Sequence, residues 1–312
     1  MYASLRKRFH KRNFLTMGDV TGPEIMDILE FARELKGAKY RGETHTFCAG
    51  KTLAMIFQKP STRTRVSFEV GMSQLGGHAL NLSVGDLQLG RGETIADTAR
   101  VLSRYVGGIM IRTFNQQDVE ILAAEATVPV INGLTDREHP CQVLADLMTI
   151  LEHKKRFEGL KLAWVGDGNN VCNSLLLACP KLGMDIVVAG PPGYEPPPEI
   201  VSAARAASKG GKVEILNNPV EAVYDADIVV TDTWASMGQE DEREERVKIF
   251  QPYQVNSALV SHAKPDYIFL HCLPAHRGEE VTDEIIDGPA SRVWDEAENR
   301  LHVQKALLSL LL

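Results

Sequence analysis

The sequence of 312 residues lacks the features that mark several specialised classes of protein. No run of 18 or more apolar residues occurs, so we expect no membrane among its partners. Its 34 Lys and Arg are outnumbered by 41 Asp and Glu, which gives a net charge of -7. This balance disfavours a nucleic-acid partner, because phosphate backbones bind to basic faces. With 44% hydrophobic residues, the chain is long enough to bury a large core and to form two domains.

Cysteine is scarce and has no regular spacing. An odd number of cysteines without framework spacing predicts reduced thiols, and hence a cytoplasmic protein, or a mitochondrial-matrix protein if the source is eukaryotic. A basic segment at residues 4–12 resembles the end of a transit peptide, but it is short and we read it as a solvated N-terminal strap. The cysteines are Cys48, Cys141, Cys172, Cys179 and Cys272.

Apolar, β-branched runs alternate with helical patterns along the whole chain. Such alternation predicts an α/β fold of parallel sheets covered by helices on both faces. Helices are expected at residues 93–105 and 139–155, and a proline-rich loop at residues 191–200 should lead into another helix at 198. The predicted strands are 52–57, 108–112, 129–132, 161–166, 185–190, 212–216, 227–232 and 267–272.

These strands fall into two groups, separated by the helix at residues 139–155. We therefore predict two doubly wound domains, each with a parallel sheet flanked by helices, joined by interdomain helices. The first domain is expected at residues 1–150, with a C-terminal helix at about 292–312 packing back on it, and the second at residues 151–291.

Hydroxyl and guanidinium groups are concentrated in the segment QKPSTRTRVSFEV, residues 58–70. It predicts a strand, a tight turn and a helix that starts close to Ser61 or Thr62. Hydroxyl side chains at its first residues cap such a helix, and its free N–H groups can bind an anion. The planar guanidinium of Arg63 can donate two further hydrogen bonds to the oxygens of that anion. Arg65 is read as a surface ion pair with Glu69. No glycine-rich stretch ends in Gly-Lys-Ser or Gly-Lys-Thr, which disfavours a nucleoside triphosphate.

Polar side chains also stand at two other predicted strand ends or helix starts. Arg112 ends one strand, and His139 and Gln142 open the next long helix on one face. Taken singly, His139 is more often a helix cap and Arg112 a surface charge. Because ligands collect at the carboxyl ends of parallel strands, these residues can converge with Arg63, and together they can hold the negative charge that develops on a carbonyl oxygen.

Four separated motifs carry a family resemblance. STRTR at 61–65, HPCQ at 139–142, DTWASMG at 232–238 and HCLPAHRGEEV at 271–281 resemble the carbamoyltransferases, and the set is most similar to the branch that acts on ornithine. The likeness runs from about residue 13 to the end. It implies transfer of the carbamoyl group of carbamoyl phosphate to the δ-amine of L-ornithine, giving L-citrulline and phosphate.

The resemblance also implies the site residues, with Arg112, His139 and Cys272 as the catalytic ones. A homotrimer, or a multiple of trimers, is implied, with Gln88 reaching a neighbour's phosphate. The ornithine-binding residues would be Asn170, Asp232, Ser236 and Met237. The residues that bind carbamoyl phosphate would be Ser61, Thr62, Arg63, Thr64, Gln88, Arg112, His139, Pro140, Cys141, Gln142, Cys272, Leu273 and Arg300.

The residues agree chemically with this assignment. An amine like that of lysine, with a pKa near ~10.4, must lose a proton before it attacks a carbonyl. Positioning and charge stabilisation do nearly all the work, so no metal or organic cofactor is expected. Cys272 is read as a binding group, because its neighbour His271 should point to the opposite face of the strand. A zinc site formed by His139, Cys141, Cys272 and His276 lacks metal-type spacing.

Other functions were weighed against this one. VGDGNNV at 165–171 resembles a dinucleotide fingerprint, but Val171 replaces its third glycine and no acidic residue ends the next strand, so an NAD-dependent dehydrogenase is disfavoured. A binding-only homologue would usually have lost some motif residues. The acidic loop at 236–245 disfavours aspartate as acceptor. Putrescine is the closer rival, but it lacks the carboxylate that Asn170 would recognise.

Overall fold

The computed structural model describes residues 2–83, 85, 87–88, 92–236, 238 and 240–312. Its contacts divide the chain into two compact units. Unit 1 consists of Met1–Ala145 and Glu298–Leu312, and unit 2 of Asp146–Ala297. The assignment of one substrate to each domain stays a prediction and is taken up below.

Within the described ranges, no helix combines the length and the apolar character that a membrane crossing requires.

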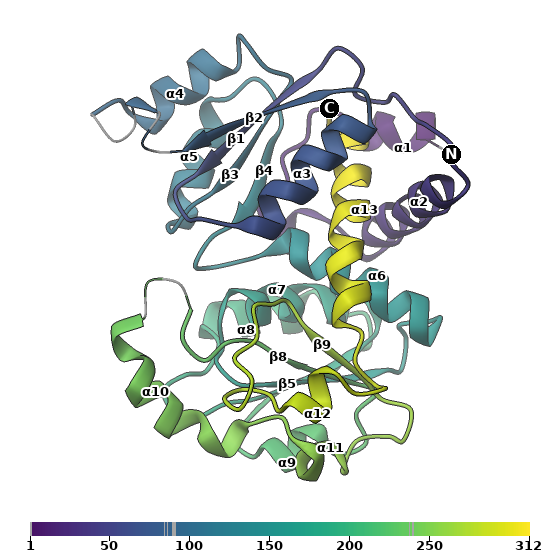
Figure 1. Ribbon diagram of the computed structural model, residues 1–312, viewed down its shortest axis with the longest axis vertical. Helices are drawn as coiled ribbons and strands as arrows, with labels where there is room; N and C mark the ends of the chain where they lie inside the picture. The colour runs from purple at the N-terminus through teal and green to yellow at the C-terminus, as the bar shows by residue number, and fades with distance from the viewer. Residues whose placement is uncertain (1, 84, 86, 89–91, 237, 239) are drawn as a thin grey trace. The chain divides into compact units, whose positions relative to one another are not determined.

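Unit 1 is built on a four-stranded parallel sheet in the order β2-β1-β3-β4 (Figure 1). The predicted α/β class with parallel sheets is confirmed. The edge strand β2 was not predicted, because its side chains are only partly buried and form no continuous apolar run. The strands are β1 (Thr52–Phe57), β2 (His78–Ser83), β3 (Gly108–Arg112) and β4 (Val130–Leu134).

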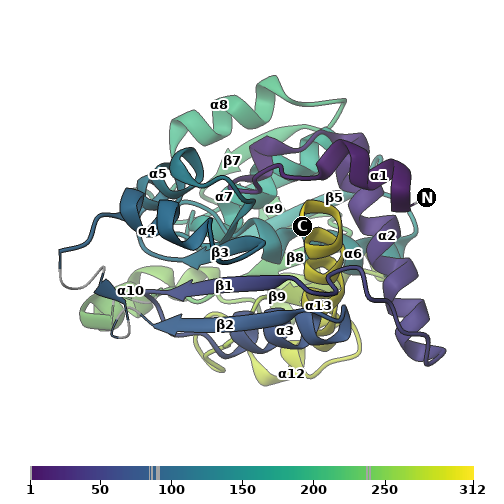
Figure 2. The same cartoon turned by 90° about the horizontal axis from the view of Figure 1, so that it is seen from above.

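Helices cover both faces of this sheet. Ala99 of α4 and Leu122 of α5 pack on one face against Ile56 and Ile109. Helix α3 follows β1 on the other face and lies beside α13, where Lys305 Nζ donates to Gln74 Oε1 at 3.0 Å (Figures 1 and 2). The helices with residues in unit 1 are α1 (Tyr2–Phe9), α2 (Gly22–Tyr40), α3 (Thr62–Gln74), α4 (Ile95–Leu102), α5 (Gln116–Glu125), α6 (Pro140–Lys154) and α13 (Val293–Leu311).

Unit 2 contains a five-stranded parallel sheet in the order β7-β6-β5-β8-β9. The strands are β5 (Lys161–Val165), β6 (Asp185–Ala189), β7 (Val213–Leu216), β8 (Ile228–Thr231) and β9 (Ile268–His271). The helices between and after them are α7 (Asn170–Ala178), α8 (Pro198–Ala206), α9 (Pro219–Val223), α10 (Arg243–Phe250), α11 (Ser257–Val260) and α12 (Asp283–Ile286).

The core of unit 2 follows from the alternation of side chains along its strands. Val165, Val229 and Phe269 point to one face of the sheet, where they pack with Ala222 of α9 and Ile285 of α12.

Both sheets are doubly wound, so each has a point at which the chain changes its direction of winding. In unit 1 this point lies between β1 and β3, and in unit 2 between β5 and β8. Ligands of open α/β sheets bind at such points, outside the carboxyl ends of the strands.

The carboxyl ends of β5 and β6 approach so closely that glycine is required. A Cβ atom on Gly190 would lie 2.5 Å from the carbonyl oxygen of Gly166. Gly166 itself has a φ of 136°, which side chains of L residues rarely adopt. These two glycines keep the end of the unit 2 sheet compact where the turn leading to α7 begins.

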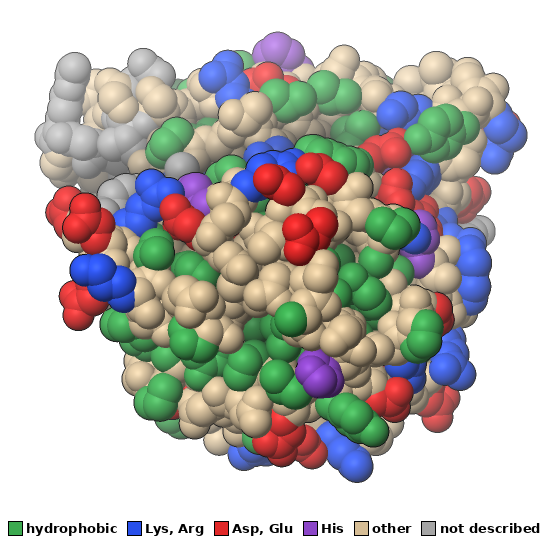
Figure 3. All heavy atoms as spheres, turned by 60° about the horizontal axis from the view of Figure 1, so that its bottom comes forward, with side chains coloured by type: hydrophobic (Ala, Val, Ile, Leu, Met, Phe, Trp, Pro, Cys, Tyr) green, Lys and Arg blue, Asp and Glu red, His purple; other side chains and the backbone are tan. Residues whose placement is uncertain are grey.

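Acidic and basic side chains are interspersed among hydrophobic ones on the face drawn in Figure 3. Unit 2 contains ion pairs of this kind; Arg277 Nη1, for example, lies 2.8 Å from Asp283 Oδ1 and 2.5 Å from Asp287 Oδ2. That face therefore carries no extended basic area, in keeping with the net charge of the chain.

Candidate active site

The N-terminus of helix α3 lies at the winding point of unit 1. Ser61 is the N-cap in an extended conformation, and its side chain accepts a hydrogen bond from the Thr64 N–H at 3.1 Å. The predicted helix start is thereby confirmed. The following N–H groups and the positive end of the helix dipole make this end suited to an anion. Arg65 pairs with Glu69 at 3.1 Å, as predicted, and is exposed.

Three arginine side chains of unit 1 contribute positive charge near the N-terminus of α3. Arg63 lies in the first turn of α3, Arg112 ends β3, and Arg300 lies on α13. Arg112 and Arg300 are buried. Arg300 donates from Nη1 to Gln142 Oε1 at 2.7 Å and from Nη2 to Thr64 Oγ1 at 3.2 Å. Gathered cations in a buried site are costly unless an anion joins them, so the arrangement favours an anionic ligand.

His139 precedes α6 and lies within the field of these cations. Burial, followed by the charges of Arg300, Arg112 and Arg63, holds the pKa of His139 well below its ordinary value. The imidazole is therefore neutral near neutral pH. A neutral ring can donate one hydrogen bond to a carbonyl oxygen without adding another positive charge. Sequence analysis named all four residues, and the structure brings them together within unit 1.

Pro140 and Cys141 form the start of α6. The Cys141 thiol is buried and donates to the carbonyl oxygen of Asn132 at 3.4 Å. Burial raises the pKa of Cys141 to about 12, so the thiol stays protonated. Its side chain is thus part of the core of unit 1, and the binding roles of Pro140 and Cys141 stay predictions.

Gln88 lies between β2 and α4 and is exposed. Its carbonyl oxygen accepts a hydrogen bond from the N–H of Glu93 at 3.2 Å. The side chain is accessible at the surface of unit 1, and its proposed contact with a neighbouring subunit stays a prediction.

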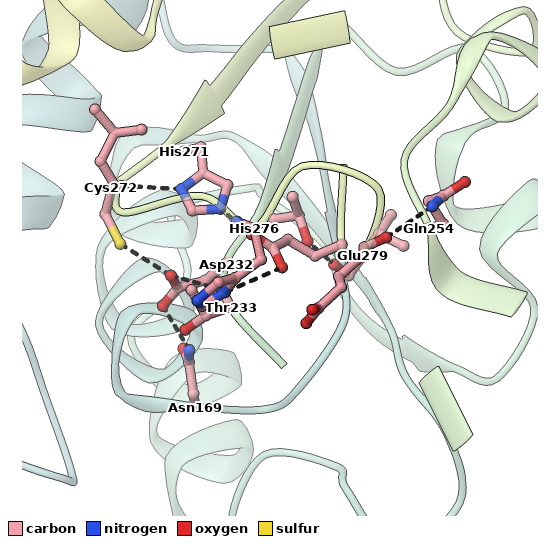
Figure 4. Close-up of polar contacts among 12 residues, drawn as sticks. Asn169, Asp232, Thr233, Gln254, His271, Cys272, His276 and Glu279 are labelled. Carbon is pink, nitrogen blue, oxygen red and sulfur yellow. Dashed lines mark hydrogen bonds and ion pairs between the residues drawn. The ribbon is translucent and has the colours of Figure 1, made fainter. Parts of the chain in front are cut away.

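In unit 2, the carboxylate of Asp232 lies at the winding point, directly after β8 (Figure 4). Its Oδ2 accepts from Asn169 Nδ2 at 2.7 Å. Its Oδ1 accepts from the Cys272 thiol at 3.1 Å and from the Thr233 N–H at 2.8 Å. Figure 4 shows Asp232 between the amide of Asn169 and the sulfur of Cys272. The chain thus holds one carboxylate in place with donors from three segments.

Cys272 is a thiol and not a thiolate in this arrangement. Burial of the sulfur, followed by the charge of Asp232, raises the pKa of Cys272 well above its ordinary value. The neighbouring His271 does not activate the sulfur through its ring. Its Nδ1 accepts from the Leu273 N–H at 2.9 Å, and its Nε2 lies 3.2 Å from Glu280 Oε1. This geometry supports the interpretation of Cys272 as a binding group, since nucleophilic cysteines need a lowered pKa.

The backbone at Leu273 is in the left-handed region, with a φ of 58°. That conformation is uncommon for a residue other than glycine, and such residues concentrate at functional sites. The hydrogen bond from its N–H to His271 Nδ1 at 2.9 Å fixes the peptide plane between Cys272 and Leu273.

The remaining predicted ornithine residues lie in two segments of unit 2. Asn170 is the first residue of α7, and Ser236 is half-buried in the loop after β8. Met237 lies outside the described residues. Their roles in binding stay predictions.

Asn169 was expected, with Asn170, at the rim of a turn suited to an amino-acid carboxylate, but only Asn170 was predicted to bind ornithine. Asn169 Oδ1 caps α7 by accepting from the N–H groups of Val171 and Cys172, while its Nδ2 donates to Asp232. The two adjacent asparagines, Asn169 and Asn170, indicate that one of them caps a helix. Only the exact start of α7 decides which one does so.

Asp167 and Arg246 form a second pair that the sequence did not reveal. Arg246 Nη1 lies 3.3 Å from Asp167 Oδ2 and donates to the Trp234 carbonyl oxygen at 3.1 Å. Its guanidinium also lies over the ring of Tyr194 at 5.0 Å. Burial raises the pKa of Asp167 to about 6 despite the nearby arginine. Arg246 therefore ties α10 to the loop that follows β8.

The turn after β5 does not have the features of a dinucleotide site. A Cβ on Gly168 would lie 2.4 Å from the backbone nitrogen of Pro196, so this glycine is required by a neighbouring loop. The Gly168 N–H donates to the carbonyl oxygen of Tyr194 at 2.9 Å. A pyrophosphate would need such N–H groups, and these observations agree with the rejection of a dehydrogenase.

Among the residues that the structure describes, two groups of side chains have ligand atoms close enough to share a metal ion. The atoms of Asp232, His271 and Cys272 lie within 4.8 Å of one another, as do those of His276, Glu279 and Glu280. In the first group, each of the three side chains already has a hydrogen-bond partner within the chain. Neither group is the zinc set that sequence analysis considered, so the geometry gives that alternative no support.

The fold is that of a two-unit α/β protein in which unit 1 gathers cationic side chains at a helix start and unit 2 holds a buried carboxylate at its winding point. The comparisons with known proteins identify this arrangement as that of a carbamoyltransferase. The chain belongs to the aspartate/ornithine carbamoyltransferase family. Residues 12–152 match the model of its carbamoyl-phosphate-binding domain, and residues 158–311 match that of its aspartate/ornithine-binding domain. The family resemblance inferred from the four motifs is confirmed.

Known members of the family are similar over nearly the whole chain. An ornithine carbamoyltransferase of Pyrococcus abyssi is 64% identical over 303 residues, covering 96% of both chains. An ornithine carbamoyltransferase of Pyrococcus furiosus, named anabolic, is 63% identical with the same coverage. A solved structure of the Pyrococcus furiosus ornithine carbamoyltransferase has a TM-score of 0.94 at 62% identity and covers 97% of each chain. One from Thermus thermophilus has a TM-score of 0.87 at 43% identity, covering 96% of this chain and 99% of the other.

The state of Cys272 can be tested by alkylation. Because its thiol pKa is raised, Cys272 in the native protein should react with iodoacetamide at least about tenfold more slowly at about pH 8 than a model thiol does. Asp232→Asn should speed the reaction by removing a negative charge next to the sulfur. Mass spectrometry of the labelled peptide measures the rate, and reaction as fast as that of a free thiol would contradict the assignment.

Proposed function

We propose that the chain transfers the carbamoyl group of carbamoyl phosphate to the δ-amine of L-ornithine, forming L-citrulline and phosphate. The family and the names of relatives that are 64% and 63% identical bear out the predicted carbamoyltransferase activity. The observation that carries the assignment of donor and site is the gathering of Arg63, Arg112 and Arg300 about a neutral His139, at the N-terminus of a helix.

The phosphate of the donor is bound at the start of α3. Ser61, Thr62 and Thr64 supply hydroxyl and backbone N–H groups, and Arg63 supplies a guanidinium that can bind two phosphate oxygens at once. These groups hold the phosphate before the reaction and stabilise it as it leaves. Because the donors are fixed by the helix, they need little reorganisation when charge develops on the leaving group.

The carbonyl oxygen of the donor is held by Arg112 and His139. Attack of the amine turns this oxygen into an oxyanion, which a guanidinium and a neutral imidazole N–H stabilise. Gln142, held by Arg300 at 2.7 Å, faces the same region and can bind the carbamoyl group. The electron pair of the breaking C–O bond leaves with the phosphate.

The acceptor amine is bound by unit 2. Asp232 pairs with the α-ammonium of ornithine and is itself held by Asn169 and Cys272. The δ-ammonium first loses one proton to solvent, and the lone pair that this exposes forms the new C–N bond. A second proton then passes from the nitrogen to the departing phosphate. Cys272 and the carbonyl of Leu273 contact the carbamoyl NH₂ group. The reaction requires that the donor bound by unit 1 meet the amine bound by unit 2.

The wider biological setting follows from the same proposal. The activity belongs to arginine biosynthesis, which the name of the anabolic relative supports. The enzyme is a homotrimer or a multiple of trimers, in which Gln88 completes a neighbour's donor site. Its reduced cysteines agree with a cytoplasmic location. No metal or organic cofactor takes part in the steps described.

The acceptor can be identified by a direct comparison. The purified protein should form citrulline from ornithine faster than it forms carbamoylputrescine from putrescine, by a factor of about 10² or more, since putrescine lacks a carboxylate and leaves its binding groups unused. A colorimetric assay for the carbamoylated product measures both rates. Equal rates, or a preference for putrescine, would reject ornithine as the substrate.

Arg63 should be essential for turnover but not for folding. Arg63→Ala should lower kcat/KM for carbamoyl phosphate by about 10²-fold or more, because it removes a fixed cation from the phosphate. The control is Arg65→Ala, which removes an exposed guanidinium from the same turn of α3. Circular dichroism should show that both variants fold. Full activity in Arg63→Ala would place the phosphate elsewhere.

Asn169 should affect the KM for ornithine and not the KM for carbamoyl phosphate. Asn169→Ala removes a hydrogen bond to a carboxylate, so the KM for ornithine should rise by about tenfold or more while the KM for carbamoyl phosphate stays the same. It also removes a helix cap, at a cost of about 1 kcal/mol of stability. Asn218→Ala is the matched control, because Asn218 caps α9 with the same pair of bonds, to Val220 and Glu221. Equal effects of the two variants on the KM for ornithine would show that only the cap matters.

A further inference from the structure

Lys59 is a buried lysine in the turn between β1 and α3. Only 3% of its surface is exposed, although lysine is rarely buried without a partner. Its ammonium forms an ion pair with Asp136 and lies 4.1 Å from the centre of the Phe114 ring. A carboxylate and an aromatic face therefore both compensate for the burial of this charge.

The two partners of Lys59 belong to the turns that follow the next two strands of the sheet. Phe114 comes two residues after Arg112, and Asp136 comes three residues before His139. The Asp136 N–H donates to the carbonyl oxygen of Phe114 at 2.9 Å, so these two turns are also bonded to each other. The ammonium of Lys59 thus lies where the turns after β1, β3 and β4 meet.

Gln58 adds a second connection at the same place. Its N–H donates to the carbonyl oxygen of Arg112 at 2.9 Å, and its Oε1 accepts from the hydroxyl of Thr113 at 2.6 Å. Neither Gln58 nor Lys59 is among the site residues predicted from the sequence. Together they connect the end of β1 to the residues that follow β3.

The three connected turns each carry part of the donor site. Ser61 and Arg63 follow the first turn, Arg112 precedes the second, and His139 follows the third. Pro60 stands between Lys59 and Ser61, and its ring restricts the backbone on both sides. A shift of Lys59 is therefore transmitted to the N-cap of α3 rather than absorbed by the turn.

We propose that Lys59 is a positioning residue for carbamoyl phosphate: by binding Asp136 and Phe114, its ammonium fixes the phosphate-binding start of α3 relative to the turns that hold Arg112 and His139. The inference rests on the proposed function, because the ligand it positions for is the carbamoyl donor. We propose no direct contact between Lys59 and that donor, because its ammonium already interacts with the Asp136 carboxylate and the Phe114 ring.

Two substitutions separate this role from a direct contact with the phosphate. Lys59→Met keeps a long apolar stem but removes the ammonium. Asp136→Asn leaves the lysine in place and removes its partner, whose side chain is 61% exposed and so can be replaced without disturbing the core. If Lys59 positions the turn, both variants should weaken donor binding; if it contacts the phosphate, Asp136→Asn should free the ammonium and leave binding unchanged or tighter.

The measurements are steady-state kinetics with both substrates and calorimetric titration with inorganic phosphate. Lys59→Met should raise the KM for carbamoyl phosphate and the Kd for phosphate by about tenfold or more, because small displacements of binding groups have large effects. The KM for ornithine should stay within about twofold of its original value. The double variant should bind phosphate about as weakly as either single variant, because both substitutions break one interaction.

Lys154 and Asp266 provide a matched control pair. Lys154 has a side chain that is 8% exposed, and its ammonium lies 2.9 Å from Asp266 Oδ2, a carboxylate on a side chain that is 77% exposed. Both residues belong to unit 2, away from the start of α3 in the chain. Lys154→Met and Asp266→Asn should therefore leave the Kd for phosphate unchanged, whatever they do to stability.

Different results would overturn different parts of the argument. Unchanged phosphate binding in Lys59→Met, with stability alone reduced, would show that the lysine only supports the fold. Weaker phosphate binding in Lys59→Met together with unchanged or tighter binding in Asp136→Asn would make Lys59 a direct ligand. Failure of the original protein to form citrulline would reject the proposed function, while the titrations with phosphate would still report on Lys59.

Discussion

The gathering of three arginines about one neutral histidine is the constraint on which the donor site depends. Cations repel one another, and burial of Arg112 and Arg300 strengthens that repulsion, so the fold must hold them where an anion can compensate. A parallel sheet provides this place, because its strand ends and helix starts meet at one edge. Burial, followed by the same charges, holds the pKa of His139 well below its ordinary value. The site can therefore bind a phosphate and polarise a carbonyl with groups already in position.

The proposed acceptor site of unit 2 has the opposite charge and lies at the corresponding point of a sheet with the same kind of topology. Asp232 and Asn169 follow the two strands at the winding point, and Cys272 follows the strand beyond them. Hydrogen bonds hold the carboxylate in a fixed orientation. Burial, followed by the charge of Asp232, raises the pKa of the Cys272 thiol well above its ordinary value. A protonated thiol is a poor nucleophile, which supports the interpretation of Cys272 as a binding group. Unit 1 thus gathers cationic side chains, and unit 2 holds a buried carboxylate, in keeping with the proposed binding of an anionic donor by the first and a cationic amine by the second.

Much of this organisation could be predicted from the sequence, for identifiable reasons. Strands such as β1 and β3 are buried on both faces and give continuous apolar runs, and the cap of α3 needs only a hydroxyl in the right place. Strand β2 escaped prediction because it lies at a sheet edge and is half-exposed. The parts played by Asn169 and Arg246 depend on where a helix starts and on which loops meet. Such long-range contacts leave no local pattern in the sequence.

A crystal structure of the protein with carbamoyl phosphate bound is the most direct measurement. The phosphate should lie against the N-terminus of α3, within hydrogen-bond distance of Ser61, Arg63 and Thr64, with the carbonyl oxygen of the donor facing Arg112 and His139. Density for the donor at any other part of the chain would contradict the central claim.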